Sequence, residues 1–224
     1  MNNYKKLYFI PLVLLLVFVV FIVLVKTVDV SVIGENSTNI GLTFINKGFY
    51  ESHKLINNTF YNVSKYLGYL SFLIIGFFLV VGVIQLIKRK GFFKVDTDLL
   101  LLGAIYVLTM VFYVFFEIVV VNVRPIIVDE PMEASFPSSH TLLAVVAVGT
   151  LLFEILKRIS NKYLKWGSLI AASLFMIVLI VFRLLSGVHW VTDIIAGIIL
   201  GLAIVSLFIV LNIDIKEKQI NQEK

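Results

Sequence analysis

The chain has 224 residues, of which 60% are hydrophobic and 15% are charged, and its mean hydropathy is +1.02. A soluble domain is about 45–50% apolar and about 25% charged. The composition therefore excludes an ordinary soluble protein and predicts an integral membrane protein. The sequence has no cysteine, which excludes a disulfide framework and a thiol nucleophile. The net charge of +5 comes from lysines and arginines beside apolar segments, a distribution that indicates membrane topology and not nucleic-acid binding.

The apolar stretches predict six membrane-spanning helices, since a helix needs roughly 20 residues to cross about 30 Å of hydrocarbon. The stretches lie near residues 8–25, 67–87, 99–121, 138–156, 166–184 and 190–211. The first follows Lys5 and Lys6, as in a signal peptide, but it continues to Lys26 without a small-residue cleavage pattern, so we expect an uncleaved helix. We predict an all-α, polytopic membrane protein that is a single six-helix bundle over residues 1–224.

Two short basic loops predict the orientation of this bundle. They contain Lys88, Arg89, Lys90 and Lys94 in one case, and Lys157, Arg158, Lys162 and Lys165 in the other. Loops rich in lysine and arginine stay in the cytoplasm, so we expect both termini there as well. Segments 26–66, 122–137 and 185–189 then face the outside of a plasma membrane. In the first of these, apolar positions such as Phe49 among polar residues indicate a short amphipathic helix at the membrane interface.

His189 and Asp193 begin the last predicted span. Four residues apart on a helix, they would share one face with about 6 Å between their Cβ atoms. A carboxylate that accepts from one imidazole nitrogen leaves the other nitrogen free to act as a nucleophile. The alternative interpretation is an aspartate favoured by the helix dipole beside an interfacial histidine. Arg183, six residues earlier, argues for function, because a guanidinium at the end of an apolar span can bind phosphate oxygens.

Pro137-Ser138-Ser139-His140 opens the fourth predicted span. Ser138 is a candidate N-cap, and the free N–H groups of the first helical turn form an anion site. His140 lies in that turn and could protonate a leaving oxygen. A plain capped helix explains the serines but not His140. Arg124-Pro125, after the third span, is a weaker signal by itself and gains weight from these neighbours.

These motifs resemble the signatures of the type 2 phosphatidic acid phosphatase superfamily, which are Lys-x6-Arg-Pro, Pro-Ser-Gly-His and Ser-Arg-x5-His-x3-Asp. The signature region covers residues 117–201. The resemblance implies that His189 forms a phosphohistidine, that Asp193 orients it, and that His140 protonates the leaving group and then activates water. It also implies metal-independent catalysis without a cofactor, with the phosphoryl oxygens held by Arg124, Arg183, Ser138 and Ser139.

The chain departs from these signatures at three positions. Ser139 replaces a glycine, Phe182 replaces a serine, and Glu117 stands where the family has lysine. The charge reversal at Glu117 opposes phosphate binding if the carboxylate is ionised nearby. Glu117 could pair with an active-site arginine, stay protonated or contact an amine on the substrate. We favour the pairing, because buried charges usually require partners.

The sequence predicts an enzyme that hydrolyses a lipid phosphate or pyrophosphate at the outer leaflet. Among the family's substrates, undecaprenyl pyrophosphate, phosphatidylglycerophosphate and phosphatidic acid are the candidates. A lipid phosphotransferase that uses the same phosphoenzyme, and a non-catalytic lipid-phosphate binder, remain alternatives. The expected partners are the lipid substrate and membrane lipids, with no nucleic acid; a monomer and a homodimer both remain open. Composition and size are typical of a bacterial protein.

Overall fold

The computed structural model describes residues 3–53 and 57–222 of the chain. Within them, six helices are long and apolar enough to cross a membrane. These helices are α1 (Phe9–Thr27), α3 (Asn58–Arg89), α4 (Thr97–Ile118), α5 (Ser139–Arg158), α6 (Lys162–Leu185) and α7 (Val191–Gln222). The predicted six-span, all-α membrane fold is confirmed. The second and sixth spans are longer than their apolar cores suggested, since both α3 and α7 have 32 residues.

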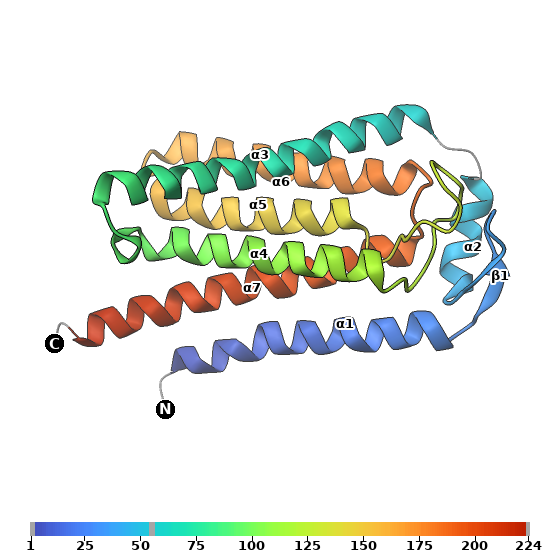
Figure 1. The fold of residues 1–224 in the computed structure, drawn as a ribbon, viewed down its shortest axis with the longest axis horizontal. Helices are drawn as coiled ribbons and strands as arrows, with labels where there is room; N and C mark the ends of the chain where they lie inside the picture. The colour runs from blue at the N-terminus through green and yellow to red at the C-terminus, as the bar shows by residue number, and fades with distance from the viewer. Residues whose placement is uncertain (1–2, 54–56, 223–224) are drawn as a thin grey trace.

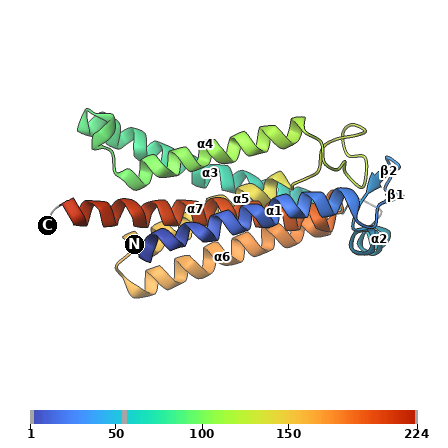
Figure 2. The same cartoon turned by 90° about the horizontal axis from the view of Figure 1, so that it is seen from below.

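Helix α5 lies at the centre of the bundle and packs against α3, α4, α6 and α7 (Figure 1). Its most apolar stretch is 61% buried, whereas that of α1 is only 17% buried. Figure 2 shows α1 alongside α7, the neighbour with which it makes most of its contacts. Both chain termini lie at one end of the bundle, as an even number of spans requires, and the loops that carry the predicted site lie at the other (Figure 1).

Two glycines of α7 allow the close approach of α5. A Cβ atom on Gly197 would lie 2.9 Å from the Ser138 carbonyl oxygen, and one on Gly201 would lie 2.7 Å from Val145. Small residues four apart on a membrane helix permit such contacts. The pair therefore brings the start of α5 against α7, which places two of the predicted signatures side by side.

The segment between α1 and α3 contains a small hairpin and a helix. Strands β1 (Ser31–Ile33) and β2 (Thr38–Ile40) pair antiparallel, and α2 (Thr43–Ser52) follows. The predicted short helix in this segment is confirmed, whereas the hairpin was not predicted. Asn46 of α2 donates a hydrogen bond to the Thr192 hydroxyl at 3.1 Å, with both side chains buried. This contact fastens α2 to the beginning of α7, beside the predicted site.

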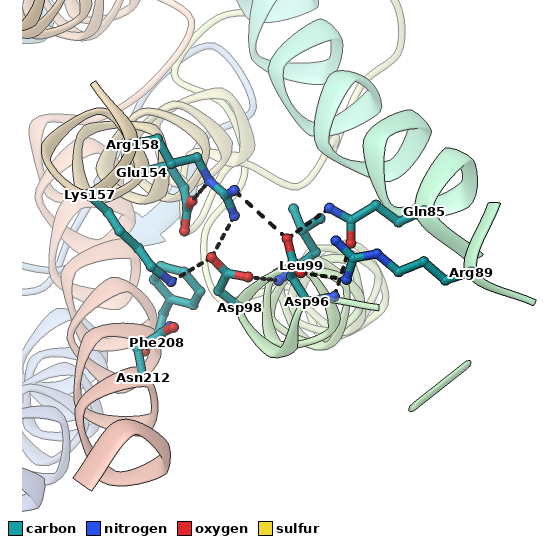
Figure 3. A network of polar contacts seen from close by, with 10 residues as sticks. All are labelled: Gln85, Arg89, Asp96, Asp98, Leu99, Glu154, Lys157, Arg158, Phe208 and Asn212. Atoms are coloured by element: carbon teal, nitrogen blue, oxygen red, sulfur yellow. Dashed lines mark hydrogen bonds and ion pairs between the residues drawn. The ribbon is translucent and has the colours of Figure 1, made fainter. Parts of the chain in front are cut away.

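The end of the bundle near the termini is joined by a network of ion pairs (Figure 3). Asp98 of α4, whose side chain is 5% exposed, accepts from Lys157 at 2.6 Å and from Arg158 of α5. Arg158 also binds Glu154, one turn earlier on the same helix. Because the partners come from two helices, the network fixes α4 against α5.

A second part of this network lies between α3 and α4. Asp96 accepts from the Gln85 amide at 2.8 Å and from the Arg89 guanidinium at 2.6 Å. These hydrogen bonds hold the pKa of the Asp96 carboxyl below its usual range, and the one from Gln85 has the larger effect. The short helix η2 (Phe92–Lys94) completes the turn, and Arg89 binds the Lys94 carbonyl oxygen.

Candidate active site

Three chain segments meet at the end of the bundle opposite the termini. They are the loop between α4 and α5, the first turn of α5, and the connection from α6 to α7 (Figure 1). Together with the last turn of α6 and the first turn of α7, they carry the residues that the sequence motifs predicted, which are Arg124, Ser138, Ser139, His140, Arg183, His189 and Asp193.

The loop between α4 and α5 folds back on itself. Val123 and Ala134 form an antiparallel bridge, and the Arg124 N–H donates to the Glu133 carbonyl oxygen at 3.0 Å. The buried Trp190 indole N–H donates to the Val123 carbonyl oxygen at 2.7 Å. The tryptophan thereby ties this loop to the α6–α7 connection and holds Arg124 beside His189.

His189 is 3% exposed and has one ring nitrogen engaged and one free. Its Nδ1 lies 3.1 Å from the Ser135 carbonyl oxygen. A carbonyl oxygen can only accept, so Nδ1 carries the proton and the Nε2 lone pair is available. Nε2 has no hydrogen-bond partner among the described residues. This tautomer is the one that an Nε2 nucleophile requires.

The surroundings of His189 favour its neutral form. Burial lowers the pKa of the imidazole well below its usual range, and the positive charges of Arg183 and Arg124 act in the same direction. The hydrogen bond to the Ser135 carbonyl opposes this effect but is the weaker influence. His189 is therefore unprotonated at neutral pH, with its Nε2 lone pair available for attack.

Asp193 does not accept a hydrogen bond from His189, contrary to the sequence-based expectation. The closest approach, from Oδ2 to Nδ1, is 3.7 Å. Its carboxylate accepts instead from the Trp190 N–H at 3.0 Å and from the Asn122 amide at 3.2 Å. The expected geometry assumed two residues on one helix, whereas α7 begins at Val191 and leaves His189 in the preceding loop. Asp193 is thus a fully buried carboxyl group near the His189 ring.

The two serines before His140 differ in their surroundings. Ser138 occupies the N-cap position of α5, but its side chain makes no capping bond, contrary to expectation. Its buried hydroxyl accepts from Thr141 at 3.1 Å, and its N–H donates to the Asp193 carbonyl oxygen at 3.0 Å. Ser139 lines the cavity that reaches His189. The role of either serine in phosphate binding stays a prediction.

His140 and Arg183 both carry buried nitrogen atoms without a partner among the described residues, Nδ1 and Nε respectively. The Arg183 guanidinium carbon lies 5.7 Å from the centre of the Tyr61 ring, and the residue is 2% exposed. The His140 ring packs against Gly68 of α3, where a Cβ atom would lie 2.4 Å from Cδ2. Unpaired buried donors are rare in proteins and indicate a site for a ligand.

Arg124 is paired with Glu133, at 3.2 Å between Nε and Oε2. Glu117 forms no ion pair within 4.0 Å among the described residues, but the charge of Arg124 acts on its carboxyl group from farther away, so its pairing with an active-site arginine stays a prediction. The carboxylate lies in the wall of a cavity of about 20 Å³ that it shares with Arg124 and His189. Three aromatic residues of α4 belong to the apolar part of that wall: Phe112, Tyr113 and Phe116.

The sequence motifs missed several residues that hold the site together. Asn122 binds the Asp193 carboxylate, and Trp190 binds both Asp193 and the α4–α5 loop. Asn122 is a polar residue directly after an apolar span, and this position in the sequence could have indicated a role at the site. Ser135 contributes through its backbone carbonyl, and no side-chain pattern could have revealed it.

The fold and the site define a multi-pass membrane protein whose histidines and arginines converge at one end of the bundle. A model of the PAP2 superfamily matches residues 98–215 of the chain. The protein belongs to the PAP2 superfamily, as the signatures had suggested.

A solved structure supports the fold over nearly the whole chain. A transmembrane PAP2-type phosphatidylglycerolphosphate phosphatase from Bacillus subtilis has a TM-score of 0.62 to this protein at 21% sequence identity. The similarity covers 93% of this chain and 97% of that one. No curated protein sequence matches the chain. At this identity the likeness establishes the common fold.

Proposed function

We propose that the protein is a membrane-embedded lipid phosphatase that works through a phosphohistidine. The observation that carries this proposal is the neutral, buried His189, which has an unpartnered Nε2 and lines a cavity together with Arg124. Membership of the PAP2 superfamily supports phosphatase chemistry. A lipid-phosphate binder would need the arginines, but it would not need a histidine held in the tautomer of a nucleophile.

In the first step, His189 Nε2 attacks the phosphorus atom of the substrate. A bond forms between Nε2 and phosphorus, the bond from phosphorus to the lipid oxygen breaks, and His140 gives its proton to that oxygen. The attacked imidazole keeps its Nδ1 proton on the Ser135 carbonyl and becomes positively charged. The Asp193 carboxylate, 3.7 Å from Nδ1, stabilises this charge.

In the second step, water attacks phosphorus on the opposite side from Nε2. His140 takes a proton from the water, the bond from phosphorus to Nε2 breaks, and inorganic phosphate is released. Arg183 and Arg124 neutralise the equatorial oxygens in both steps, which is the largest requirement of phosphoryl transfer. Arg183 Nε is unpartnered and therefore available to bind such an oxygen.

The substrate follows from the position of the site. Aromatic residues of α4 line the cavity beside Glu117, and α4 is also exposed along its outer face, so an apolar chain can lie next to the phosphate pocket. The related Bacillus subtilis protein is described as a phosphatidylglycerolphosphate phosphatase. Phosphatidylglycerophosphate is therefore a candidate beside phosphatidic acid and undecaprenyl pyrophosphate.

The basic loops support an orientation with the site outside the cell. Lys88 and Arg89 end α3, Lys90 follows it, and Lys157 and Arg158 end α5; these helix ends lie at the end of the bundle where both termini lie (Figure 1). The positive-inside rule places this end in the cytoplasm. The active site then faces the extracellular side of the plasma membrane and acts on lipids of the outer leaflet.

Phosphate release from a panel of purified lipids tests the proposal. Wild-type protein in detergent is offered phosphatidic acid, phosphatidylglycerophosphate and undecaprenyl pyrophosphate, with and without orthovanadate as a phosphate-like inhibitor. We expect release from at least one lipid, inhibition by vanadate, and loss of release in His189→Ala. Full activity in His189→Ala would exclude the proposed mechanism, and a purified acceptor alcohol added to the assay would reveal transfer in place of hydrolysis.

A further inference from the structure

One face of α3 forms a wall of the active site. Tyr61 lies against the Arg183 guanidinium at 5.7 Å, and Gly68 lies against the His140 ring. Tyr61 and Gly68 are seven residues apart, which is about two helical turns and places them on the same face. The first turns of α3 therefore contact both an arginine and a histidine of the site, although they precede residues 98–215 of the family match.

Lys65 lies on this face between the two contacts. It follows Tyr61 by four residues and precedes Gly68 by three, so it shares their stripe of the helix. Its ammonium group is 6.0 Å from the Tyr61 ring centre, and its charge acts electrostatically on His140. The Tyr61 ring thus has two cations nearby, Lys65 and Arg183. Lys65 lies about 10 Å from the start of α3, at a rise of about 1.5 Å per residue, and just before the apolar stretch at residues 67–87, with its side chain exposed.

The charges around the site favour a third positively charged side chain beside a bound phosphate. Besides its histidines, the site holds two arginine and three carboxyl side chains: Arg124, Arg183, Glu117, Glu133 and Asp193. Arg124 is already paired with Glu133 at 3.2 Å, and His189 is neutral. A phosphate monoester would bring further negative charge into a partly desolvated site, which is unfavourable without compensation. Lys65 supplies a positive charge from the side of Arg183 and His140.

We propose that Lys65 is a substrate-binding residue that holds a non-bridging oxygen of the lipid phosphate, opposite the Arg124 side of the site. This inference rests on the proposed phosphatase function. The ammonium group reaches the oxygen along the face of Tyr61, whose ring attracts the lysine and Arg183. Lys65 compensates for Glu117, the carboxylate that lines the phosphate cavity.

A lysine that merely extends toward the lipid headgroups is the competing explanation, since long basic side chains reach the interface from within a span. Such a lysine would bind water and lipid, and its replacement would not alter phosphate binding. Lys88, at the other end of the same helix, is a matched control of this kind.

The first test compares Lys65→Met with Lys88→Met in the phosphate-release assay, with phosphatidic acid in detergent micelles. We expect KM to rise about tenfold in Lys65→Met, with a smaller change in kcat, because a charge-assisted contact to the phosphate is lost. Lys65→Arg should restore most of the affinity. Equal kinetics in the two methionine variants, or a loss confined to kcat, would overturn the inference.

The second test measures binding without turnover. Orthovanadate should raise the thermal unfolding temperature of the wild type, and Lys65→Met should need about ten times more vanadate for half of that effect. If the wild type released no phosphate from any lipid but its vanadate affinity still depended on Lys65, the proposed function would fail and the inference would stand. If vanadate bound equally well to both methionine variants, the inference would fail whatever the turnover.

A third comparison uses the carboxylate at position 117. In the Lys65→Met background, Glu117→Lys removes a negative charge and adds a positive one beside the phosphate cavity. We expect this double variant to recover vanadate affinity to within a few-fold of wild type. A double variant as weak as Lys65→Met would contradict the compensation between these two positions. Each variant is checked for a cooperative thermal unfolding transition, so a variant that does not fold is recognised. In that case the vanadate affinity of Lys65→Arg is compared with that of the wild type.

Discussion

Two clusters of polar and charged residues lie at opposite ends of the same helix bundle, and they differ in how fully their groups are paired. Near the termini, Asp98 holds both Lys157 and Arg158, and Asp96 holds Arg89 (Figure 3). At the other end, His189, His140 and Arg183 each keep a buried nitrogen without a partner among the described residues.

We interpret the difference as one between groups that stabilise the bundle and groups that, under the proposed function, bind or attack a substrate. Charged groups that already have partners fix their helices against one another, and they are not available to bind a ligand. Unpaired buried donors are costly, and a protein retains them where a ligand satisfies them. On this view, substitutions near Asp98 should change stability, and substitutions near His189 should change activity. Each prediction below tests that division.

Among these predictions, Asp193→Asn should have the largest effect, which is a fall in kcat. Loss of the carboxylate charge removes the stabilisation of the positively charged phosphohistidine, so kcat should fall about 100-fold. Asparagine keeps a carbonyl oxygen that can accept from Trp190, and the thermal unfolding temperature should stay close to that of the wild type. Phosphate release and thermal unfolding of the same sample measure both effects. Unchanged turnover would remove Asp193 from the mechanism.

Gly68→Ala should lower kcat by about tenfold or more, because displacement of a catalytic group by a fraction of an ångström is costly. The new Cβ atom would lie 2.4 Å from His140 Cδ2 and would push the imidazole away. Gly76→Ala is the matched control on the same helix, since no heavy atom lies within 4 Å of its Cβ position. Equal activity of the two variants would show that His140 tolerates the shift or takes no part in the reaction.

Asp98→Asn should act on stability alone. It leaves Lys157 and Arg158 without their shared carboxylate and should lower the free energy of unfolding by about 1–3 kcal/mol, the lower part of the range for buried pairs because both cations are 41–48% exposed. Denaturation in detergent measures this change. Activity per mole of folded protein should equal that of the wild type, and a large loss of kcat would contradict the division between the two ends.

Glu51→Gln is the control for Asp98→Asn. Glu51 forms an exposed pair with Lys47 at 4.0 Å, and such surface pairs contribute less than about 1 kcal/mol. An equal loss of stability in Glu51→Gln and Asp98→Asn would show that burial of the ion pairs near the termini is not what matters.

The smallest expected effect is on the pH dependence of stability. Because burial lowers the pKa of His189, the folded protein binds fewer protons there than the unfolded chain, whose histidine titrates near 6.5. The contribution of His189 to stability is therefore fully present above about pH 6.5 and is lost as pH falls toward the lower pKa of the folded state. As the pH is lowered from 8 to 5, the unfolding temperature of His189→Asn should fall less steeply than that of the wild type. Parallel profiles would contradict a neutral, buried His189.

The sequence predicted the bundle well because the bilayer imposes a simple rule on helix length and composition. The predicted spans fall within the observed helices for most of their length, and the short helix α2 was expected from its apolar positions.

The detailed geometry of the site depended on contacts that no local pattern records. The spacing of His189 and Asp193 suggested a hydrogen bond, but α7 begins two residues after His189, so the helical rule did not apply. The true partner of His189 is the backbone carbonyl of Ser135, 54 residues earlier. Similarly, the partner of Arg124 is Glu133 in its own loop, which only the folding of that loop brings near.

Lys65 illustrates the same limit. Within α3 it resembles an interfacial lysine, and only the packing of Tyr61 on Arg183 and of Gly68 on His140 gives it a place at the site. The signatures all lie between residues 117 and 201, whereas the site also uses the helix before them. If Lys65 binds phosphate, a residue of α3 that lies outside the signature region belongs to the same site as His140, Arg183 and His189.

The most direct test of the central claim is to trap the phosphoenzyme. Wild-type protein is mixed briefly with a lipid labelled with ³²P in its phosphate, then quenched in base and analysed. A phosphohistidine is stable in base and is released by acid, so we predict an acid-labile label on a peptide containing His189, absent from His189→Ala and increased in a variant slow in the second step. Turnover of the lipid without any label on His189, or an equal label on His189→Ala, would contradict the account.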